Sequence, residues 1–557
     1  MTDADSLFVI RNSHEYRFVL IFSVIALVIA SIPYVVGAAL ATEQRLFGGF
    51  VYGVEDCYSY LAKMRQGAEG AWLFHIAYTP EPHSGTFFFP FHLLLGKVAA
   101  LLPGGGLTAR MVWVYHSARV IFGLGLLLTV YRFLAFFTVR VAVRRLAWLM
   151  VTFGGGLGWL LVALGQSNWL GSMPLDFILP EGFTFLVLYA LPHIALARTL
   201  LLWGILFLLR AWERGPTPDV PSPGRATCNT QHVSRFTFHA AMAGACWLVM
   251  GLIVPFYVAV AWAVTGVAWV ALGLRQRRVM WREALVATVA ALISAPVVAY
   301  SAWVFTTDPV YVTWAAQNRI LSPHPLHYLA AYGVLLTLAA FAVRDAWHDK
   351  GPTWLALAWV AVVPFLVYLP FNLQRRLVEG VQIPLSLLAA LGVSSFRLQG
   401  FRLRVVVSIL VIGLSLTNVM LVAGNCLALR GQPAPAYRDA GEVAALDWLN
   451  GRVESGDVVL ATYETGNYLP ARTWAHAFVG HGPESVRAAE KKALVARFFS
   501  ATTDEAWRRQ LLMQYGVDYV FWGPAERTLG GFDPGRAVYL RMVYEEEGYL
   551  IFEVVDE

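Results

Sequence analysis

The chain has 557 residues, of which 58% are hydrophobic and only 14% are charged, whereas an ordinary soluble domain carries roughly 25% charged residues. This composition excludes an ordinary soluble globular protein and favours a membrane protein. The net charge of +6 is divided unevenly, because residues 431–557 carry about −7 and the rest of the chain about +13. A basic membrane portion follows the positive-inside rule, so nucleic-acid binding need not be invoked.

Apolar runs long enough to span a bilayer recur along the chain, and we count about eleven of them. They lie at residues 18–40, 108–137, 146–165, 183–210, 237–254, 255–274, 284–305, 326–343, 353–370, 381–396 and 405–424. Residues 237–274 are also compatible with a different pair of breaks or with a re-entrant segment. The sequence therefore predicts a polytopic α-helical membrane protein whose first 424 residues form the transmembrane domain.

Basic residues predict the orientation of these runs. They cluster in every second connection, around residues 140–145, 210–235, 275–278, 344–350 and 397–404, which marks these connections as cytoplasmic. The chain is then expected in the plasma membrane, with its N-terminus in the cytoplasm. The predicted outer loops are residues 41–107, 166–182, 306–325 and 371–380. Residues 87–102 are apolar but short, and we expect them to lie in or dip into the outer interface. The proline-rich residues 212–234 predict an extended or disordered cytoplasmic linker.

Residues 425–557 have a different pattern, that of a small extracytoplasmic α/β domain. Helical spacing covers 439–448 and 487–499, and short strands are expected at 458–461, 518–522, 538–544 and 549–555. Residues 465–468 and 480–485 look like turns. The glycine cluster at 154–158 lies inside an apolar run and predicts close packing or a helix kink rather than a nucleotide site.

Two adjacent carboxylates, Glu55 and Asp56, are the strongest candidates for chemistry. They stand at the expected start of an amphipathic helix in the first outer loop, where Tyr60 and Lys63 share a face with Asp56. A carboxylate can take a proton from an attacking hydroxyl or bind a divalent ion. The alternative is a solvated helix start, since acidic residues are favoured there by the helix dipole.

A second candidate is the adjacent pair Arg375 and Arg376, which the predicted topology places in an outer loop, where the positive-inside rule disfavours arginine. Guanidinium groups suit bidentate phosphate binding, so a lipid phosphate is the natural ligand. Contact with ordinary phospholipid headgroups, or an ion pair with Glu379, remains the alternative. Further candidates for substrate contacts are Tyr60, Lys63, His193, Glu379 and His481, and weaker ones for sugar contacts are Asp176, Glu181 and Asp308.

Short motifs resemble the GT-C superfamily of polytopic glycosyltransferases, which includes protein O-mannosyltransferases and the aminoarabinose transferase of lipid A. The resemblance rests on Glu55-Asp56, Tyr60, Met64, Gly70-Ala71-Trp72-Leu73 and Phe89-Pro90-Phe91. It implies that a first-loop acid is the catalytic base or a metal ligand, and that the donor is a sugar on a polyprenyl phosphate or pyrophosphate. The Arg375-Arg376 loop is similar to family loops that hold the donor phosphate. Residues 463–467 and Gly480-His481 resemble the outer domain of bacterial members.

The resemblance leaves the register of the acid open. Families with an Asp-Glu pair align their leading acid with Glu55, whereas families with an Asp followed by a tyrosine align it with Asp56 through Tyr60. We assign the base to Asp56, with Glu55 as its partner. A divalent cation, Mg²⁺ or Mn²⁺, is a candidate cofactor, and Asp56 is the residue that would bind it.

The sequence-based hypothesis is a hexosyl- or pentosyltransferase that moves a sugar from a polyprenyl-phosphate carrier to an acceptor glycan, lipid or protein. Two other classes remain open: a non-catalytic transporter or lipid-binding protein, and a ligase or polymerase of surface glycans. Intramembrane charges and an inverted repeat would favour a transporter. A ligase or polymerase would use outer arginines without a first-loop acid.

Overall fold

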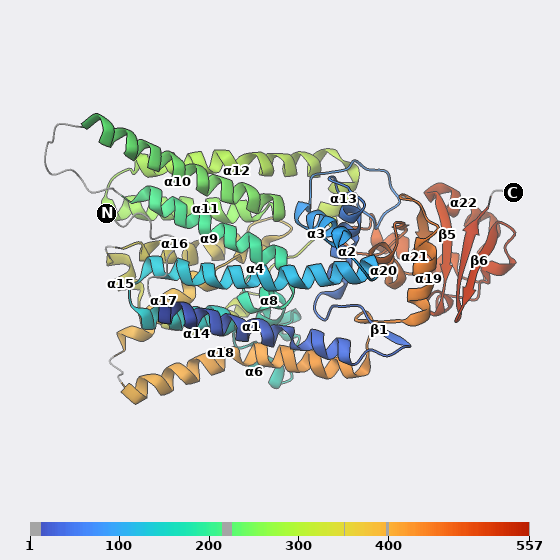
Figure 1. Cartoon of the computed structure of the whole chain (residues 1–557), viewed down its shortest axis with the longest axis horizontal. Helices are drawn as coiled ribbons and strands as arrows, with labels where there is room; N and C mark the ends of the chain where they lie inside the picture. Colours follow the sequence, from blue (N-terminus) through green and yellow to red (C-terminus); the bar gives the residue numbers. More distant parts are fainter. Residues whose placement is uncertain (1–12, 214–224, 350, 397–399, 556–557) are drawn as a thin grey trace. The chain divides into compact units, whose positions relative to one another are not determined.

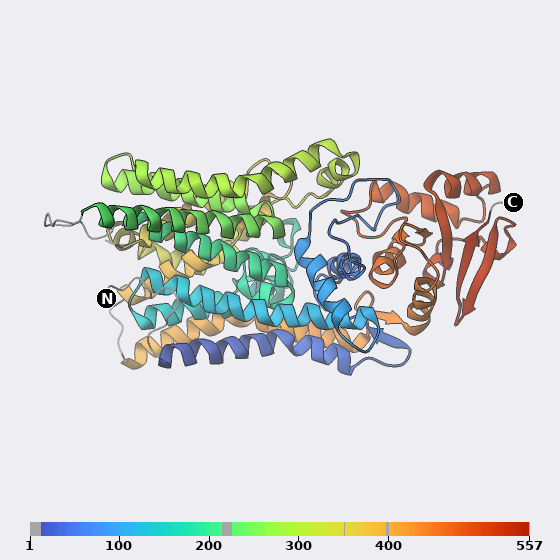
Figure 2. The ribbon, with the colours of Figure 1, turned by 45° about the horizontal axis from the view of Figure 1, so that its top comes forward.

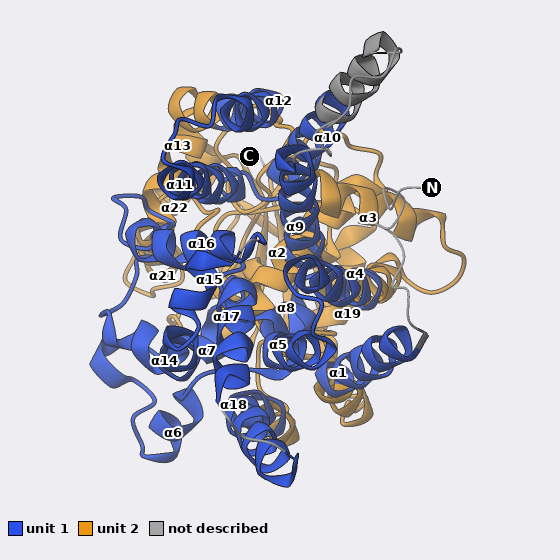
Figure 3. Ribbon diagram, turned by 90° about the vertical axis from the view of Figure 1, so that its left-hand side faces the viewer, with its two compact units in different colours: residues 1–31, 118–301, 320–423 blue, residues 32–117, 302–319, 424–557 orange. Residues whose placement is uncertain are grey.

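The structure is a computed structural model that describes residues 13–213, 225–349, 351–396 and 400–555. The chain divides into two compact units, which we describe separately (Figure 3). Unit 1 comprises residues 1–31, 118–301 and 320–423, and unit 2 comprises residues 32–117, 302–319 and 424–557. The sequence predicts a boundary at 424/425, and unit 2 in addition contains the first predicted outer loop and residues 302–319.

Long apolar helices dominate the chain (Figures 1 and 2). Four of them contribute residues to both units: α1 (Ser13–Ala39), α4 (Leu107–Phe137), α12 (Trp281–Thr307) and α18 (Gly400–Ala428). The other helices of unit 1 are α5 (Val141–Phe153), α6 (Gly158–Ala163), η2 (Trp169–Gly171), α7 (Leu175–Ile178), α8 (Thr184–Ala190), α9 (Pro192–Trp212), α10 (Arg225–Ile253), α11 (Tyr257–Gln276), α14 (Leu326–Ala340), α15 (Val343–His348), α16 (Thr353–Leu366), η3 (Gln374–Val378) and α17 (Gln382–Ser395).

Among the described residues, seven helical segments are long and apolar enough to cross a membrane. They are His14–Ala39, Leu107–Phe137, Pro192–Trp212, Tyr257–Gln276, Trp281–Thr307, Gln374–Ser395 and Gly400–Gly431, with mean hydropathies between 1.6 and 2.7. The chain is thus a multi-pass helical membrane protein. The count of about eleven spans is not confirmed, because runs 326–343 and 353–370 form helices of only 15 and 14 residues, against roughly 20 for a full crossing.

A glycine break interrupts another expected span, at residues 146–165. Helix α5 ends at Phe153, and Asp176 Oδ2 accepts the backbone N–H groups of Gly156 (2.8 Å) and Gly158 (3.0 Å). A Cβ added at Gly156 would lie 2.4 Å from the carbonyl oxygen of Ala331. The glycine cluster therefore allows close packing, as its sequence predicts, and Asp176 satisfies the backbone at the break.

The predicted linker at 212–234 is shorter than expected. Helix α9 includes Trp212, and helix α10 begins at Arg225. Residues 214–224, with the prolines on which the prediction rests, lie outside the described residues, as do residues 1–12 at the N-terminus.

Unit 2 ends in a mixed sheet of five strands in the order β4-β3-β5-β7-β6 (Figure 1). The strands are β3 (Val458–Leu460), β4 (His476–Ala477), β5 (Val517–Trp522), β6 (Leu540–Glu546) and β7 (Tyr549–Val554). Strand β3 runs parallel to β4 and β5, and β7 is antiparallel to β5 and β6. The predicted strands are confirmed. Strand β4 was not predicted, because two residues are too few to show the pattern of a strand.

The helices that lie wholly within unit 2 are α2 (Val54–Ala68), α3 (Pro90–Leu101), α13 (Pro309–Gln317), η4 (Leu429–Gly431), α19 (Ala440–Asn450), α20 (Tyr463–Arg472), α21 (Ala488–Phe498), α22 (Glu505–Tyr515), α23 (Pro524–Arg527) and η5 (Pro534–Arg536). Of these, α19, α20, α22 and α23 contact strands of the sheet. Apolar residues of α21 and α22 form one core with the strands, since Val495, Phe498, Leu511, Val520 and Phe552 are all at most 4% exposed. This burial supplies the main stabilisation of the domain.

The turn predicted at 465–468 is wrong, because these residues belong to helix α20. Thr462 caps the helix by accepting the N–H of Thr465 at 3.3 Å. Glu526 in turn accepts the N–H of Thr462 at 2.9 Å. This support comes from a residue 64 positions away, which local propensity does not reveal.

The segment after α1 pairs with the start of the C-terminal region within unit 2. Strand β1 (Arg45–Phe47) is antiparallel to β2 (Tyr437–Asp439), and Arg45 forms an ion pair of 2.6 Å with Asp439. Residues 41–107, the first predicted outer loop, and the C-terminal domain are therefore parts of one folded unit.

Helices α2 and α3 approach each other through glycine. A Cβ at Gly96 would lie 1.7 Å from the carbonyl oxygen of Met64, and one at Gly67 would lie 2.0 Å from that of Leu93. Only glycine permits so short a distance between the backbones of α2 and α3. This close packing fixes the position of α2 within unit 2. Helix α3 accounts for most of the predicted interfacial segment 87–102.

We expect Gly96→Ala to lower the free energy of unfolding by about 1–3 kcal/mol, because the two helices must separate to admit the methyl group. The thermal unfolding midpoint of the detergent-solubilised chain measures this loss. Gly424→Ala in α18 is the matched control, since its added Cβ meets no described atom within 4 Å. Equal midpoints for the two variants would contradict the close approach.

Candidate active site

The carboxylate pair lies at the start of helix α2. Glu55 and Asp56 are in the first turn, and the N-cap Gly53 has a φ of +56°, a left-handed conformation that glycine adopts without strain. Acidic side chains are stabilised at a helix N-terminus by the helix dipole. This local reason for the pair holds whether or not the residues also act in catalysis.

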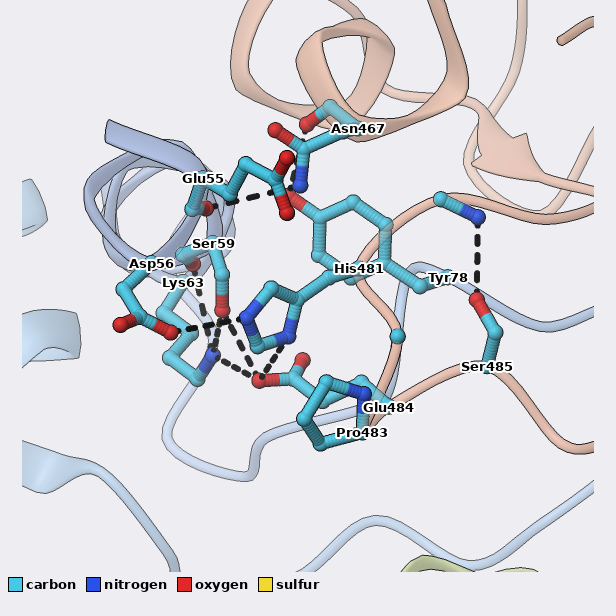
Figure 4. Close-up of polar contacts among 12 residues, drawn as sticks. Glu55, Asp56, Ser59, Lys63, Tyr78, Asn467, His481, Pro483, Glu484 and Ser485 are labelled. Carbon is cyan, nitrogen blue, oxygen red and sulfur yellow. Dashed lines mark hydrogen bonds and ion pairs between the residues drawn. The ribbon is translucent and has the colours of Figure 1, made fainter. Parts of the chain in front are cut away.

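Asp56 meets a histidine from the C-terminal domain. Its Oδ1 lies 2.9 Å from Nε2 of His481, a residue in the connection between β4 and α21 (Figure 4). The Asp56 side chain keeps 56% of its surface exposed, whereas that of His481 is 9% exposed. A fixed carboxylate with an accessible surface is the arrangement that a general base requires.

Behind His481 lies a buried ion pair. Nδ1 of His481 is 3.4 Å from Oε1 of Glu484, and the same oxygen is 2.7 Å from Nζ of Lys63. Ser59 donates its hydroxyl to this oxygen at 2.8 Å. The side chains of Lys63 and Glu484 are 1% and 4% exposed, so their charges are compensated inside the protein rather than by water.

Charges alternate along this chain of contacts, which we call the relay: Asp56, His481, Glu484 and Lys63. Burial alone raises the pKa of Glu484, but Lys63 and His481 outweigh it and lower that pKa to about 2. Burial lowers the pKa of His481, but its contacts with Asp56 and Glu484 outweigh burial and raise it to about 9. At neutral pH His481 is therefore an imidazolium between two carboxylates.

The two shifts act on stability at opposite ends of the pH scale. The stabilisation from protonated His481 is complete below its ordinary pKa of 6.5 and is lost as the pH rises to about 9. The stabilisation from ionised Glu484 is complete above 4.5 and is lost as the pH falls to about 2. Between these ranges the relay keeps its full set of charges.

Glu55 turns to a different partner. Its Oε2 accepts the hydroxyl of Tyr463 at 3.1 Å, and its backbone carbonyl accepts the amide of Asn467 at 3.5 Å. Figure 4 shows Glu55 beside Asn467 and Asp56 beside His481. The two carboxylates therefore have different surroundings although they are adjacent in sequence.

The segment that carries His481, residues 480–487, is fixed by close backbone contacts and by side chains. A Cβ at Gly480 would lie 2.5 Å from the carbonyl oxygen of Gly466 in α20. Ser485 accepts the N–H of Gly480 at 2.9 Å, and Gln317 of α13 donates to the Ser485 carbonyl at 2.9 Å. This support places the imidazole reproducibly against α2.

Two other predicted contact residues of α2 are engaged by neighbouring side chains of the protein. The ring of Tyr60 stacks on that of His92 at 4.6 Å. Lys63 is buried against Glu484 and lies 4.5 Å from the ring centroid of Phe89. Both residues therefore shape the site, and Lys63 acts through Glu484.

Arg375 and Arg376 belong to unit 1, in the short helix η3. Nε of Arg376 lies 3.5 Å from Oε1 of Glu181, and the Arg376 side chain is 35% exposed. The backbone N–H of Arg375 donates to the carbonyl of Ile320 at 3.3 Å. The exposure of Arg376 is compatible with an anionic ligand.

Glu379 pairs with an arginine that sequence reasoning missed. Its two carboxylate oxygens accept Nε and Nη2 of Arg198 at 2.5 and 2.9 Å, and both side chains are at most 1% exposed. This buried bidentate pair connects the end of η3 to α9. Because both carboxylate oxygens of Glu379 accept from Arg198, they do not face a substrate. His193, near the start of α9, is also buried, and Asp308 caps helix α13 by accepting the N–H of Val310.

The carboxylate of Asp56 and the imidazole of His481, 2.9 Å apart, are the groups that would hold a divalent cation at this site. In the part of the chain that the structure describes, no three His, Cys, Asp or Glu side chains are grouped to hold a metal ion. We derive no step through a metal.

Sequence reasoning missed Glu484, Ser59 and Tyr463 as parts of this site. One signal was available: Lys63 shares a helix face with Asp56 and Tyr60, and a lysine that becomes buried requires a carboxylate partner. The pattern does not say which of the carboxylates in the chain supplies it.

Comparison with known proteins gives a structural likeness only. No protein family profile and no curated protein matches the sequence. The oligosaccharyltransferase of Archaeoglobus fulgidus in its apo form aligns with a TM-score of 0.51 and 11% identity, covering 96% of this chain and 73% of that chain. ArnT of Cupriavidus metallidurans aligns with a TM-score of 0.49 and 12% identity in the apo state, covering 95% of this chain and 97% of that chain. The chain therefore shares the overall fold of the Archaeoglobus fulgidus oligosaccharyltransferase.

Proposed function

We propose that the chain is a glycosyltransferase that moves a hexose or pentose from a polyprenyl-phosphate carrier to an acceptor hydroxyl at the outer face of the plasma membrane. The observation that carries this proposal is the exposed carboxylate of Asp56, held at Oδ1 by His481. The fold supports sugar transfer as the first activity to test, because a solved structure that shares this fold is named an oligosaccharyltransferase. Fold alone does not assign an activity.

In this proposal Asp56 is the general base. The acceptor oxygen attacks the anomeric carbon while its proton passes to the Asp56 carboxylate. The bond between the anomeric carbon and the phosphate oxygen breaks, and its electron pair leaves with the polyprenyl phosphate. Attack opposite the leaving group inverts the anomeric configuration. Removing the proton during attack prevents positive charge from building up on the acceptor oxygen.

Arg375 and Arg376 are proposed to bind the donor phosphate. Negative charge grows on this phosphate as the sugar departs, so guanidinium groups stabilise the transition state more than the bound donor. The observation in favour is the partial exposure of the Arg376 side chain, 35% of whose surface is accessible.

Replacing both arginines by alanine is expected to weaken donor binding. Hydrogen bonds to charged groups contribute about 1.5–3 kcal/mol, so the donor Kd should rise about ten- to a hundredfold. Binding of a fluorescent polyprenyl phosphate to the detergent-solubilised chain measures this. Arg541→Ala, which removes an exposed arginine of β6, should leave the Kd unchanged, and equal affinities for all three proteins would contradict the assignment.

Transfer itself is tested with membranes that contain the full chain and a polyprenyl-phosphate sugar labelled in the sugar. We expect the label to move into a glycan, lipid or protein product that no longer behaves as the donor on chromatography. Donor recovered unchanged, with binding intact, would instead indicate a lipid-binding protein or transporter. Transfer that is insensitive to Asp56→Asn would indicate a ligase or polymerase.

A further inference from the structure

A polar cavity of about 290 Å³ lies within unit 2, lined by α2, by the segment that follows it and by residues 455–456 and 470–476. This volume is close to the lower end of the roughly 300–1,000 Å³ of small-molecule sites, so the cavity admits a small ligand rather than a lipid chain. We propose that it binds a neutral sugar. The proposal goes beyond the proposed function and does not depend on it, because binding here requires neither Asp56 nor a lipid-linked donor.

The cavity lies on the face of α2 opposite the candidate active site. Arg65 lines the cavity and follows Asp56 by nine positions in the same helix. That separation is about two and a half turns of an α-helix, so the two side chains point in opposite directions. A ligand in the cavity is therefore separated from the Asp56 carboxylate by the helix itself.

The basic side chains of the cavity leave little positive charge for an anionic ligand. Arg65 is 4% exposed, and its Nε and Nη2 donate to the carbonyl of Ala471 at 3.3 and 3.2 Å. Burial lowers the pKa of His476 to about 4 and also lowers the pKa of His75, so both imidazoles are neutral at pH 7. The carboxylate of Glu69 lines the same cavity and repels anions. These charges favour a neutral ligand over a phosphate.

Four side chains that line the cavity have polar groups without a hydrogen-bond partner among the residues that the structure describes. They are the indole N–H of Trp474, the carboxylate of Glu69, the hydroxyl of Ser455 and the imidazole of His75. Donors and acceptors are both present, and a sugar hydroxyl can donate and accept at one atom. Two hydroxyls on adjacent carbons of a sugar ring can also donate to the two oxygens of one carboxylate. This mixture suits a polyhydroxyl ligand.

Trp474 gives the cavity an aromatic wall of fixed orientation. The Arg65 guanidinium lies 4.7 Å from the centroid of the indole ring, a cation–π contact that holds the ring in place. Because Arg65 occupies one face, a ligand meets the other face or the edge that carries the N–H. An aromatic face carries partial negative charge and attracts the C–H groups of a sugar ring. Ala62, Ala71 and Ala77 add small apolar contacts.

The test is the binding of methyl glycosides to the full chain, solubilised in a detergent without a sugar headgroup. Saturation-transfer NMR with the methyl glycosides of glucose, mannose, galactose and N-acetylglucosamine detects binding, and a titration gives the Kd. We expect at least one of these glycosides to bind, and we expect methyl phosphate and a capped dipeptide not to displace it. Binding of none of the glycosides overturns the proposal, and so does displacement by methyl phosphate or by the dipeptide.

Two substitutions in the cavity locate the bound glycoside. Glu69→Gln should raise the Kd about tenfold, because a hydrogen bond to an ionised group is stronger than one to a neutral amide. Trp474→Ala should raise it at least about tenfold, since the ligand loses both the N–H donor and the apolar wall. Glu69 is exposed, so Glu69→Gln keeps the test valid even if Trp474→Ala does not fold. An unchanged Kd in Glu69→Gln overturns the proposal.

Matched controls come from the same unit. Trp448→Ala removes an indole that Arg452 stacks at 3.7 Å, and Glu490→Gln removes a carboxylate that is 54% exposed. Neither residue lines the cavity, so both variants should bind the glycoside with the wild-type Kd. A Kd raised equally in the controls and in the cavity variants would show that the glycoside binds elsewhere and would overturn the proposal.

Asp56→Asn separates this site from the proposed active site. Because the two lie on opposite faces of α2, the glycoside Kd should be the same in Asp56→Asn as in wild type. A Kd raised by Asp56→Asn would place the bound glycoside at the carboxylate pair and overturn the separate site. Glycoside binding that depends on Glu69 and Trp474, in a protein that transfers no sugar, supports the cavity site and rejects the transferase function alone.

Discussion

Replacing Lys63 by methionine is expected to lower the free energy of unfolding by about 3–5 kcal/mol, the effect of removing one partner of a buried ion pair. The cause is Glu484, which is 4% exposed and would lose its 2.7 Å contact with the ammonium group. Methionine keeps most of the lysine stem, so packing against Phe89 changes little. The thermal unfolding midpoint of the detergent-solubilised chain measures the loss.

A second substitution separates charge from packing. Glu484→Gln in the Lys63→Met background removes the uncompensated carboxylate and should recover most of the lost stability. Arg541→Met breaks an exposed pair with Glu553, and such pairs contribute about 0–1 kcal/mol. If the double variant were as unstable as Lys63→Met alone, the loss would come from packing and the electrostatic account of the relay would be wrong.

Asp56→Asn is expected to reduce kcat about 10²- to 10⁴-fold, the usual contribution of a general base. Asparagine keeps the size of the side chain and an oxygen for His481, but it cannot take the acceptor proton. Glu55→Gln should have a much smaller effect, because Glu55 is engaged by Tyr463 and not by the imidazole. Initial rates of sugar transfer at saturating donor measure both.

This comparison also resolves the register that sequence motifs leave open. A larger loss for Glu55→Gln than for Asp56→Asn would assign the base to Glu55 and remove the role of His481. Unfolding midpoints of the two variants are the control, since both substitutions lie in the first turn of α2, where a carboxylate stabilises the helix by about 0.3–1 kcal/mol.

The local sequence pattern was sufficient to predict much of the fold and the carboxylate pair of the candidate site. The strands of the C-terminal sheet alternate or run apolar over a few residues, and the carboxylate pair stands at a helix start. The rest of the site was not accessible, because His481 lies 425 positions from Asp56 in the sequence. Spacing within a segment says nothing about a contact of that range.

The errors have the same origin in long-range support. Residues 465–468 have the sequence of a turn, but they are helical because Glu526 supports the cap of α20. Residues 146–165 have the sequence of one span, but the helix breaks because Asp176 accepts the backbone N–H of Gly156. In both places a carboxylate that is distant in sequence stabilises a conformation that local propensity disfavours.

The proposed transferase breaks the bond between sugar and phosphate, whereas a transporter carries the intact lipid. The most direct measurement uses proteoliposomes with the full chain and a donor labelled in both the sugar and the polyprenyl phosphate. We predict that free polyprenyl phosphate and glycosylated acceptor appear in equal amounts, and that neither appears with Asp56→Asn. Movement of the doubly labelled donor across the bilayer without release of polyprenyl phosphate would contradict the account.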